Sequence, residues 1–461
     1  MNNSWFFQDL MTTVAERGRQ LLPAYLFRGD STQSLQNMVD ALMSGRGEAS
    51  GVAIAHQLLR HYRLLDDDAQ RSAFFRYVAT RLTPDPERII SAADAYAQAR
   101  SETALASLQA AVESPRQEFF RRLNLAPGGT QEIVHMREDL LRLIAEATNP
   151  EHAAMLTALD RDVVHLLQSW FNRGFLVLRR IDWDTPAAIL EKIIAYEAVH
   201  AIAGWDDLRR RLDPVDRRCF AFFHPSLVDD PLIFVEVALT DDTPSAIASL
   251  LAEPAKPADG EIAPTTAVFY SISNCQAGLR GISFGSFLIK QVVEDLLRDH
   301  SGLKTFVTLS PVPRFARWLA QVRDRGETGL TPAERESLAA IDHPDWYKDE
   351  ATVAAVKPLL QALAARYFLV DRSTSGNLID PVGRFHLGNG ARLERVNVLG
   401  DQSPKGLLES HGVMVNYLYE PKSIEQNHET FANAGTVVVS RSVRGHLRQS
   451  GKETLKGDAA S

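Results

Sequence analysis

The sequence predicts a two-domain α+β protein, in which an all-helical bundle precedes an α/β domain with a mixed sheet. Two observations support this prediction. In residues 1–172 the apolar positions recur at helical spacing almost throughout. From about residue 173 onward, short runs rich in Val, Ile, Phe and Thr take over, and such runs are typical of strands. We therefore expect a helical domain over 1–172 and an α/β domain over 173–461.

The first half contains clear helical segments. In the stretch SAFFRYVATRL the apolar side chains fall on one helical face. In TQEIVHMREDLLRLIAEATNP, Thr130 is a plausible N-cap, and Asn149 with Pro150 is a plausible stop. No metal-ligand spacing occurs in this half, and its histidines stand alone in the sequence. We therefore interpret the bundle as a packing and assembly domain.

The second half alternates between strand and helix signals. Residues 176–181 read as a strand, and Thr185 with Pro186 marks the start of a helix. The runs RCFAFFH, PLIFVEVAL, TAVFYSIS and KTFVTLS read as strands, with a helix over 283–298 between the last two. A strand, helix and strand of this length form a crossover unit, so the last two strands should be parallel neighbours. Two more strand candidates follow in ARLERVNVL and VMVNYLYE.

Composition limits the classes of function. The chain has 461 residues, of which 45% are hydrophobic and 23% charged, as in ordinary globular proteins. Its net charge of -8 and pI of about 5.9 give no basic patch for nucleic acid. No apolar run is long enough to span a membrane, and the N-terminus lacks the pattern of a secretory signal. With only two cysteines and no metal-ligand motif, we expect a cytoplasmic protein without a metal.

A glycine-rich turn, GLRGISFGS, opens the helix expected over 283–298. Glycines let a ligand approach the backbone closely, and the N-H groups of a helix N-terminus attract phosphate. The turn lacks both the Rossmann fingerprint and the Walker sequence. It is similar to the Arg/Gln-x-x-Gly-x-Gly turn that holds the coenzyme A pyrophosphate in the GNAT acetyltransferase superfamily, except that Ser283 stands in place of a glycine of that pattern. The residues concerned are Arg280, Gly281, Ile282, Ser283, Phe284, Gly285 and Ser286.

A wider resemblance covers nearly the whole chain. The stretches FYSISNCQAGLRGISFGSFLIKQVV, LSPVPRFARWL and FHLGNGARLERVNVLGDQSPKGLLESHGVMVNYLYEP resemble the successive signatures of the malonyl-CoA decarboxylase family. EAVHAIAGWDDLRRRL and PLIFVEVALT match it too, and so does LLDDDAQRSAFFRYVA in the helical half. The tail after residue 421 matches least. The resemblance implies a GNAT-like second domain that converts malonyl-CoA to acetyl-CoA and CO2.

The resemblance also implies which residues act. The catalytic serine of the family corresponds to Ser310 in TLSPVP, and its catalytic histidine to His386 in FHLGNGA. Its Asn-Tyr-x-Tyr tyrosine corresponds to Tyr419, near the substrate carboxylate. The turn from Arg280 to Ser286 corresponds to the segment that holds malonyl-CoA. Animal members carry a glutamate where this chain has Ser283, and we expect that this glutamate is not a universal part of the active site.

The residue types suit the reaction. Loss of CO2 from a malonyl thioester leaves an enolate, which hydrogen-bond donors can stabilise before carbon is protonated. The thioester is itself the electron sink, so we expect no metal or organic cofactor. His386 is the candidate proton donor. The hydroxyl of Ser310 could orient the carboxylate, accept a proton or act covalently, although no Gly-x-Ser-x-Gly elbow surrounds it.

Other interpretations remain open on the residues alone. The same fold could carry an acyl-CoA-dependent N-acyltransferase or a non-catalytic acyl-CoA-binding module. A serine before proline is usually a turn residue, His386 lies in a strand-like run, and His224 and His411 are rival histidines. Cys275 lacks a paired histidine motif, so we interpret it as incidental. Related enzymes assemble, so the helical half is expected to mediate a homo-oligomer, either a dimer or a tetramer.

Overall fold

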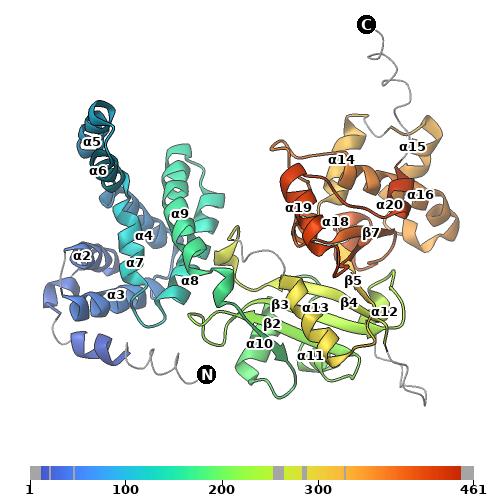
Figure 1. The fold of residues 1–461 in the computed structure, drawn as a ribbon, viewed down its shortest axis with the longest axis horizontal. Helices are drawn as coiled ribbons and strands as arrows, with labels where there is room; N and C mark the ends of the chain where they lie inside the picture. Colours follow the sequence, from blue (N-terminus) through green and yellow to red (C-terminus); the bar gives the residue numbers. More distant parts are fainter. Residues whose placement is uncertain are drawn as a thin grey trace, which may run out of the picture. The chain divides into compact units, whose positions relative to one another are not determined.

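The computed structural model describes residues 12–19, 22–27, 29–44, 47–252, 264–282, 288–326 and 329–447. The chain divides into two compact units. The first comprises Met1–Val177, Phe223–Leu232 and Cys275–Phe284, and the second comprises Leu178–Phe222, Ile233–Asn274 and Gly285–Ser461. Figure 1 labels many of the helices and strands in both units.

The first unit is built from helices, as the periodicity predicts. A helix over 12–19 precedes a 3-10 turn, η1 (Ala24–Phe27). The further helices are α2 (Ser31–Met43), α3 (Glu48–Arg63), α4 (Asp68–Arg81), α5 (Pro86–Ala99), α6 (Glu102–Val112), α7 (Pro115–Leu123), α8 (Gly129–Glu146) and α9 (Pro150–Trp170). The turns η2 (Arg173–Phe175) and η3 (Ala277–Leu279) also belong to this unit.

Two predicted helix ends in this unit are wrong. Thr130 is not the N-cap of α8, because Gly128 takes that position with φ of 68°. The Thr130 hydroxyl instead donates to Asn124 Oδ1 at 2.7 Å. Asn149 does not end α8, which stops at Glu146. The Asn149 side chain caps α9, whose first residue is Pro150, because an asparagine oxygen accepts the unpaired N-H groups of a first turn.

The second unit has one mixed sheet. Its strands are β1 (Val177–Ile181), β2 (Arg217–Phe223), β3 (Pro231–Thr240), β4 (Thr266–Asn274), β5 (Thr305–Thr308), β6 (Ser310–Pro311), β7 (Arg392–Asn397) and β8 (Met414–Leu418). They lie in the order β1-β2-β3-β4-β5-β8-β6, and β7 pairs with β8. The fold class that the sequence predicts, helices followed by a mixed-sheet domain, is confirmed.

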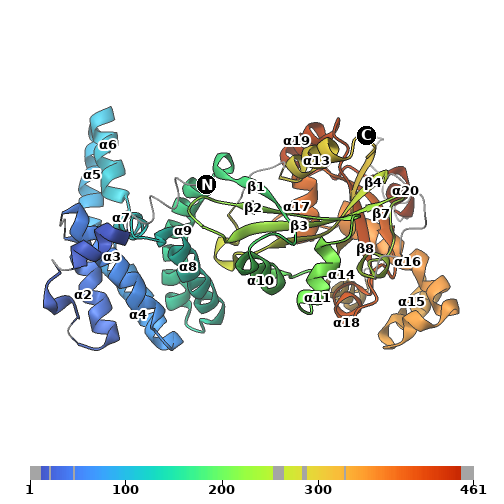
Figure 2. The same ribbon diagram turned by 90° about the horizontal axis from the view of Figure 1, so that it is seen from below.

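The helices of the second unit complete the fold. They are α10 (Ala187–Tyr196), α11 (Trp205–Leu212), α12 (Ala248–Leu251), α13 (Leu288–Asp299), α14 (Phe315–Asp324), α15 (Pro332–Ala339), α16 (Glu350–Leu369), α17 (Pro381–Gly388), α18 (Pro404–Ser410), α19 (Ile424–Ala434) and α20 (Arg441–His446). Two 3-10 turns, η4 (Ala340–Asp342) and η5 (Trp346–Lys348), separate α15 from α16. Figure 2 shows α13 on one face of the sheet and α10 and α11 on the other.

The centre of the sheet carries the predicted crossover. β4 and β5 are parallel neighbours joined through α13, with Thr266 opposite Thr305. The predicted helix over 283–298 is described from Leu288, so its expected first turn lies outside the described residues. Apolar side chains from β3, β4, β5 and β8 form the core beneath this part of the sheet: Ala238, Val268, Tyr270, Val307 and Met414. A buried apolar core therefore supports β5 and β8 where these strands end.

Candidate active site

Ser310 opens β6, immediately beyond the end of β5. It pairs with Val415 of β8, so the sheet fixes its backbone. Its side chain is buried, and its hydroxyl lies 2.9 Å from the hydroxyl oxygen of Thr308. Thr308 in turn accepts the backbone N-H of Tyr417 at 3.1 Å. The serine hydroxyl is therefore held by two strands of the sheet.

His386 lies on α17, and its strand-like reading is wrong. Asp380 is the N-cap of this helix, where it accepts the N-H of Gly383 at 2.7 Å, and Pro381 occupies the first helical position. An aspartate followed by proline is a common helix start, because proline's fixed φ suits the first turn. Asp380 is fully buried, and burial raises the pKa of its carboxyl to about 6. The cap therefore anchors the helix that carries the histidine.

The structure brings three predicted catalytic residues together. Ser310 Oγ lies 3.1 Å from His386 Nε2. His386 Nδ1 lies 2.8 Å from the hydroxyl of Tyr419. Because one ring nitrogen of a neutral imidazole donates and the other accepts, protons in this chain can point toward either end. The arrangement can therefore move a proton between a serine and a tyrosine through the imidazole.

Burial determines the charge of the hydrogen-bonded chain formed by Ser310, His386 and Tyr419. His386 is fully buried, and this burial lowers the pKa of its imidazole to about 3. Burial likewise raises the pKa of the Tyr419 phenol well above its usual value. Burial is the only cause of the lowered pKa of His386. No carboxylate contributes that would stabilise a positively charged imidazolium. At neutral pH the site therefore holds an uncharged imidazole between two uncharged hydroxyls.

Sequence analysis did not assign a role to two neighbours of this chain. The ring of Tyr417 stacks on His386 at a centroid distance of 4.6 Å. Its buried hydroxyl has no hydrogen-bond partner within the part of the chain that the structure describes. Thr308 supports Ser310, as described above. Alternation along a strand could have found both, because Thr308 precedes Ser310 by two residues and Tyr417 precedes Tyr419 by two.

The predicted coenzyme turn is described only at its beginning. Arg280 is exposed, Gly281 has φ of 81°, and Ile282 is buried. Ser283, Phe284, Gly285 and Ser286 lie outside the described residues. The structure therefore describes Arg280 to Ile282 within the first unit and the Ser310–His386–Tyr419 chain within the second, each by itself.

Within the first unit, helix α8 fixes the start of that turn. Arg137 Nη1 donates to the carbonyl oxygens of Gly278 at 2.6 Å and Arg280 at 2.9 Å. A Cβ at Gly278 would lie 1.9 Å from the carbonyl oxygen of Val134, so only glycine fits there. Sequence analysis missed Arg137, because no motif distinguishes this buried arginine from the arginines on helix surfaces. Two carbonyls of the turn are thus tied to α8.

The rival histidines have other surroundings. His224 lies against the ring of Phe171 at 4.8 Å and accepts the N-H of Ser226 at 3.2 Å. His411 is the C-cap of α18 in the left-handed conformation. Cys275 is buried.

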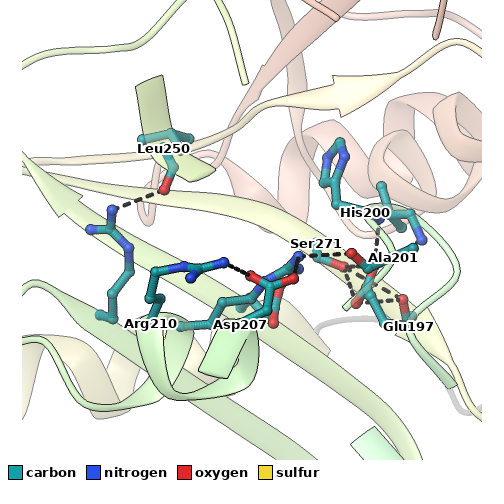
Figure 3. A network of polar contacts seen from close by, with 12 residues as sticks. Glu197, His200, Ala201, Asp207, Arg210, Leu250 and Ser271 are labelled. Carbon is teal, nitrogen blue, oxygen red and sulfur yellow. Dashed lines mark hydrogen bonds and ion pairs between the residues drawn. The ribbon is translucent and has the colours of Figure 1, made fainter. Parts of the chain in front are cut away.

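A second buried polar cluster lies beside β3 and β4 (Figure 3). Glu197 accepts the Ser271 hydroxyl at 2.8 Å and the backbone N-H of His200 at 2.7 Å. Arg211 donates to Glu236 at 3.1 Å, and burial, opposed by Arg211, raises the pKa of Glu236 to about 8. Sequence analysis did not identify this cluster, because its members come from four separate segments without a motif.

The described residues show neither a metal cluster nor a membrane-spanning helix. They contain no group of three or more His, Cys, Asp or Glu side chains that could hold a metal ion. No helix among them is long and apolar enough to cross a membrane.

Comparisons with known proteins identify the family. Residues 82–171 match the family model for the malonyl-CoA decarboxylase N-terminal domain, and residues 174–457 match that for the malonyl-CoA decarboxylase C-terminal domain. The mitochondrial malonyl-CoA decarboxylase of Anser anser anser is 34% identical over 423 residues, which cover 85% of this chain and 83% of the relative.

Solved structures agree with this result. The crystal structure of malonyl-CoA decarboxylase from Rhodopseudomonas palustris is 52% identical, with a TM-score of 0.86 over 90% of this chain and 100% of that chain. The corresponding structure from Agrobacterium vitis is 54% identical, with a TM-score of 0.83 over 90% of this chain and 99% of that chain. Both domains and nearly the full length are covered, so the chain belongs to the malonyl-CoA decarboxylase family.

Proposed function

We infer that this chain decarboxylates malonyl-CoA to acetyl-CoA and CO2, as a carboxy-lyase. Family membership supports the reaction, and one geometric observation supports its location. Ser310, His386 and Tyr419 are buried and form a continuous hydrogen-bonded chain, with distances of 3.1 Å and 2.8 Å.

The bond that breaks joins the methylene carbon of the malonyl group to its carboxylate. The electron pair of this bond passes onto the thioester oxygen, CO2 leaves, and the resulting enolate takes up one proton on carbon. Because the thioester accepts the electron pair, this chemistry requires no organic cofactor or metal. Hydrogen-bond donors aimed at the developing oxyanion supply the main stabilisation in such reactions.

His386 is the proposed proton donor. Its imidazole is neutral near pH 7, because burial lowers its pKa to about 3. An acyl group that carries a negative charge raises the pKa of a neighbouring imidazole, since opposite charges favour the protonated form. Tyr419, at Nδ1, holds the ring orientation and can pass a proton to it. The donated proton is replaced from solvent.

Ser310 is proposed to position the acyl group. Its hydroxyl is fixed between Thr308 and His386, so it can donate to the substrate carboxylate or to the thioester oxygen without a change of rotamer. A preorganised donor of this kind does not reorganise during the reaction. Arg280, Gly281, Ile282, Ser283, Phe284, Gly285 and Ser286 are proposed to hold the pyrophosphate of the coenzyme.

The remaining parts of the proposal concern the setting of the enzyme. Residues 1–172 are proposed as the domain that assembles a homo-oligomer, a dimer or a tetramer, and residues 173–461 as the catalytic domain. The protein is proposed to act in the cytoplasm. Its partners are malonyl-CoA and acetyl-CoA, with no nucleic acid and no membrane.

The test is incubation of the purified chain with malonyl-CoA alone. We expect acetyl-CoA and CO2 to appear in equal amounts without any acceptor. Free CoA that appears only when an amine is added would instead indicate an N-acyltransferase. Binding without turnover would indicate an acyl-CoA-binding module, and either result would overturn the proposed reaction.

A further inference from the structure

A cavity of about 800 Å³ lies between α14, the C-terminal end of α16 and the segment that follows it. Its lining is strongly basic and comprises the arginines Arg314, Arg317, Arg325, Arg366 and Arg372. Asp371 is the one carboxylate among the lining residues that the structure describes. The lining thus carries four more positive than negative charges, although the whole chain has a net charge of -8.

The arginines of α14 share one face of the helix. Arg314 is the N-cap, and Arg317, Gln321 and Arg325 follow at intervals of three or four residues. Residues at this spacing project from the same side of a helix. The basic wall of the cavity is therefore a continuous stripe along α14, and not a set of scattered surface charges.

The single carboxylate is already engaged. Asp371 Oδ1 accepts Arg366 Nε at 3.2 Å, and Asp371 Oδ2 accepts the indole N-H of Trp318 at 3.0 Å. Both of its oxygens therefore point to groups other than the α14 arginines. Arg372 donates to the backbone oxygens of Phe368 and Asp371, at 3.4 Å and 2.9 Å.

Two of the guanidinium groups have no hydrogen-bond or ion-pair partner among the described residues. Arg314 and Arg317 are exposed, and neither guanidinium group forms a hydrogen bond or ion pair with the part of the chain described here. Like charges gathered in one cavity repel each other, and an anion that enters removes this repulsion. The planar donor fork of arginine matches phosphate and carboxylate oxygens in a bidentate manner. The cavity volume lies in the range of small-molecule sites and exceeds what a single inorganic anion needs.

We propose that this cavity binds a small molecule that carries phosphate groups, with Arg314 and Arg317 as its principal ligands. Several arginines around one cavity favour a ligand with more than one phosphate over a monocarboxylate. Two sources have this chemistry. One is the nucleotide end of an acyl-CoA, and this source rests on the function proposed above. The other is a separate phosphorylated metabolite.

The decisive experiment titrates inorganic pyrophosphate into the full-length chain by calorimetry. The variants are Arg314→Ala with Arg317→Ala, and Arg335→Ala as a matched control on the exposed surface of α15. We expect wild type and the control to bind pyrophosphate, and the double variant to bind it about tenfold more weakly or less. Equal affinity in wild type and the double variant, or no binding by wild type, would overturn the proposal. Both replaced side chains are exposed, so the double variant should keep the wild-type circular dichroism.

Arg280→Ala separates this site from the proposed coenzyme turn. If pyrophosphate binding depends on Arg280 and not on Arg314 or Arg317, the proposed cavity site is wrong. The turn that begins at Arg280 is then the phosphate-binding site. Kinetics with malonyl-CoA then identify the source. A raised KM with unchanged kcat in the double variant, together with competition by pyrophosphate, supports the nucleotide end of the substrate. An unchanged KM without competition supports a separate metabolite. The calorimetric result stands even if the chain does not decarboxylate malonyl-CoA.

Discussion

The Ser310–His386–Tyr419 chain and the arginine cavity belong to the same structural unit and handle charge in opposite ways. The first is buried and uncharged, because burial lowers the pKa of His386 to about 3. The second carries five guanidinium groups, two of which face solvent without a partner among the described residues. The difference fits the two proposed roles, with proton transfer assigned to the buried, uncharged residues and anion binding assigned to the solvated arginines.

Removal of the imidazole should have the largest effect. We expect His386→Ala to lower kcat about 10³-fold, because general acid catalysis contributes roughly 10²- to 10⁴-fold. His165→Ala, an exposed histidine on α9, is the matched control and should retain wild-type kcat. Steady-state release of CO2 measures both. A kcat of His386→Ala within tenfold of the wild-type value would contradict the comparison, because the buried hydrogen-bonded residues would then not be the catalytic region.

Loss of the serine hydroxyl should have the next largest effect. Ser310→Ala removes a preorganised donor from the same chain, and such a loss lowers kcat about 10²-fold. KM for malonyl-CoA should change little if the hydroxyl acts mainly in the transition state. A large increase in KM with unchanged kcat would instead assign Ser310 to ground-state binding. Initial rates over a range of malonyl-CoA concentrations separate these outcomes.

The lowered pKa of His386 predicts a loss of stability in acid. The folded state takes up the proton only near pH 3, whereas the unfolded chain takes it up near pH 6.5, the usual pKa of histidine. Stability is therefore fully present above pH 6.5 and falls as pH drops toward 3, by about 1.4 kcal/mol per pH unit.

Urea unfolding at pH 6.5 and pH 4.5 measures this effect in wild type and His386→Asn. We expect wild type to lose roughly 2–3 kcal/mol more than the variant over this interval. Other groups titrate in both proteins, so the difference isolates the histidine. Parallel losses in the two proteins would contradict a neutral, buried imidazole.

The two tyrosines that touch His386 should differ. Tyr419→Phe removes the hydrogen bond to Nδ1 and should lower kcat about tenfold, the usual worth of one such bond. Tyr417→Phe keeps the stacked ring and deletes a hydroxyl that has no partner among the described residues, so activity and stability should stay close to wild type. The measurement is kcat of the two variants. A larger loss of kcat in Tyr417→Phe than in Tyr419→Phe would contradict the roles assigned to the two tyrosines.

Much of the fold follows from local patterns in the sequence. The strands β2, β3, β4 and β5 coincide with short runs rich in β-branched and aromatic residues, because such residues suit a buried sheet. The ends of the helices do not follow from the same patterns. Gly128 and Asn149 cap helices through backbone conformation and a side-chain oxygen, and the apolar period says nothing about either. The strand-like reading of His386 failed in the same way, since its helix starts at the Asp380 cap.

The site could be predicted only in part. Family motifs gave Ser310, His386 and Tyr419 as candidates, but the contact between the first two joins residues 76 positions apart. No local pattern encodes such a distance. The α14 arginines follow helical spacing in the sequence, yet they form a cavity only because α16 and the segment after it lie opposite. Tertiary packing, and not periodicity, therefore decides which side chains meet.

The central claim is that the imidazole at the centre of the buried chain is uncharged until substrate arrives. Nitrogen NMR of the full-length protein with labelled histidines observes the imidazole ring directly. The His386 resonances are assigned by comparison with His386→Asn. We predict a neutral His386 at every pH from 5 to 8 in the absence of malonyl-CoA, because its pKa is about 3. A resonance of His386 that titrates near pH 6.5 would contradict the claim and with it the role of burial in this site.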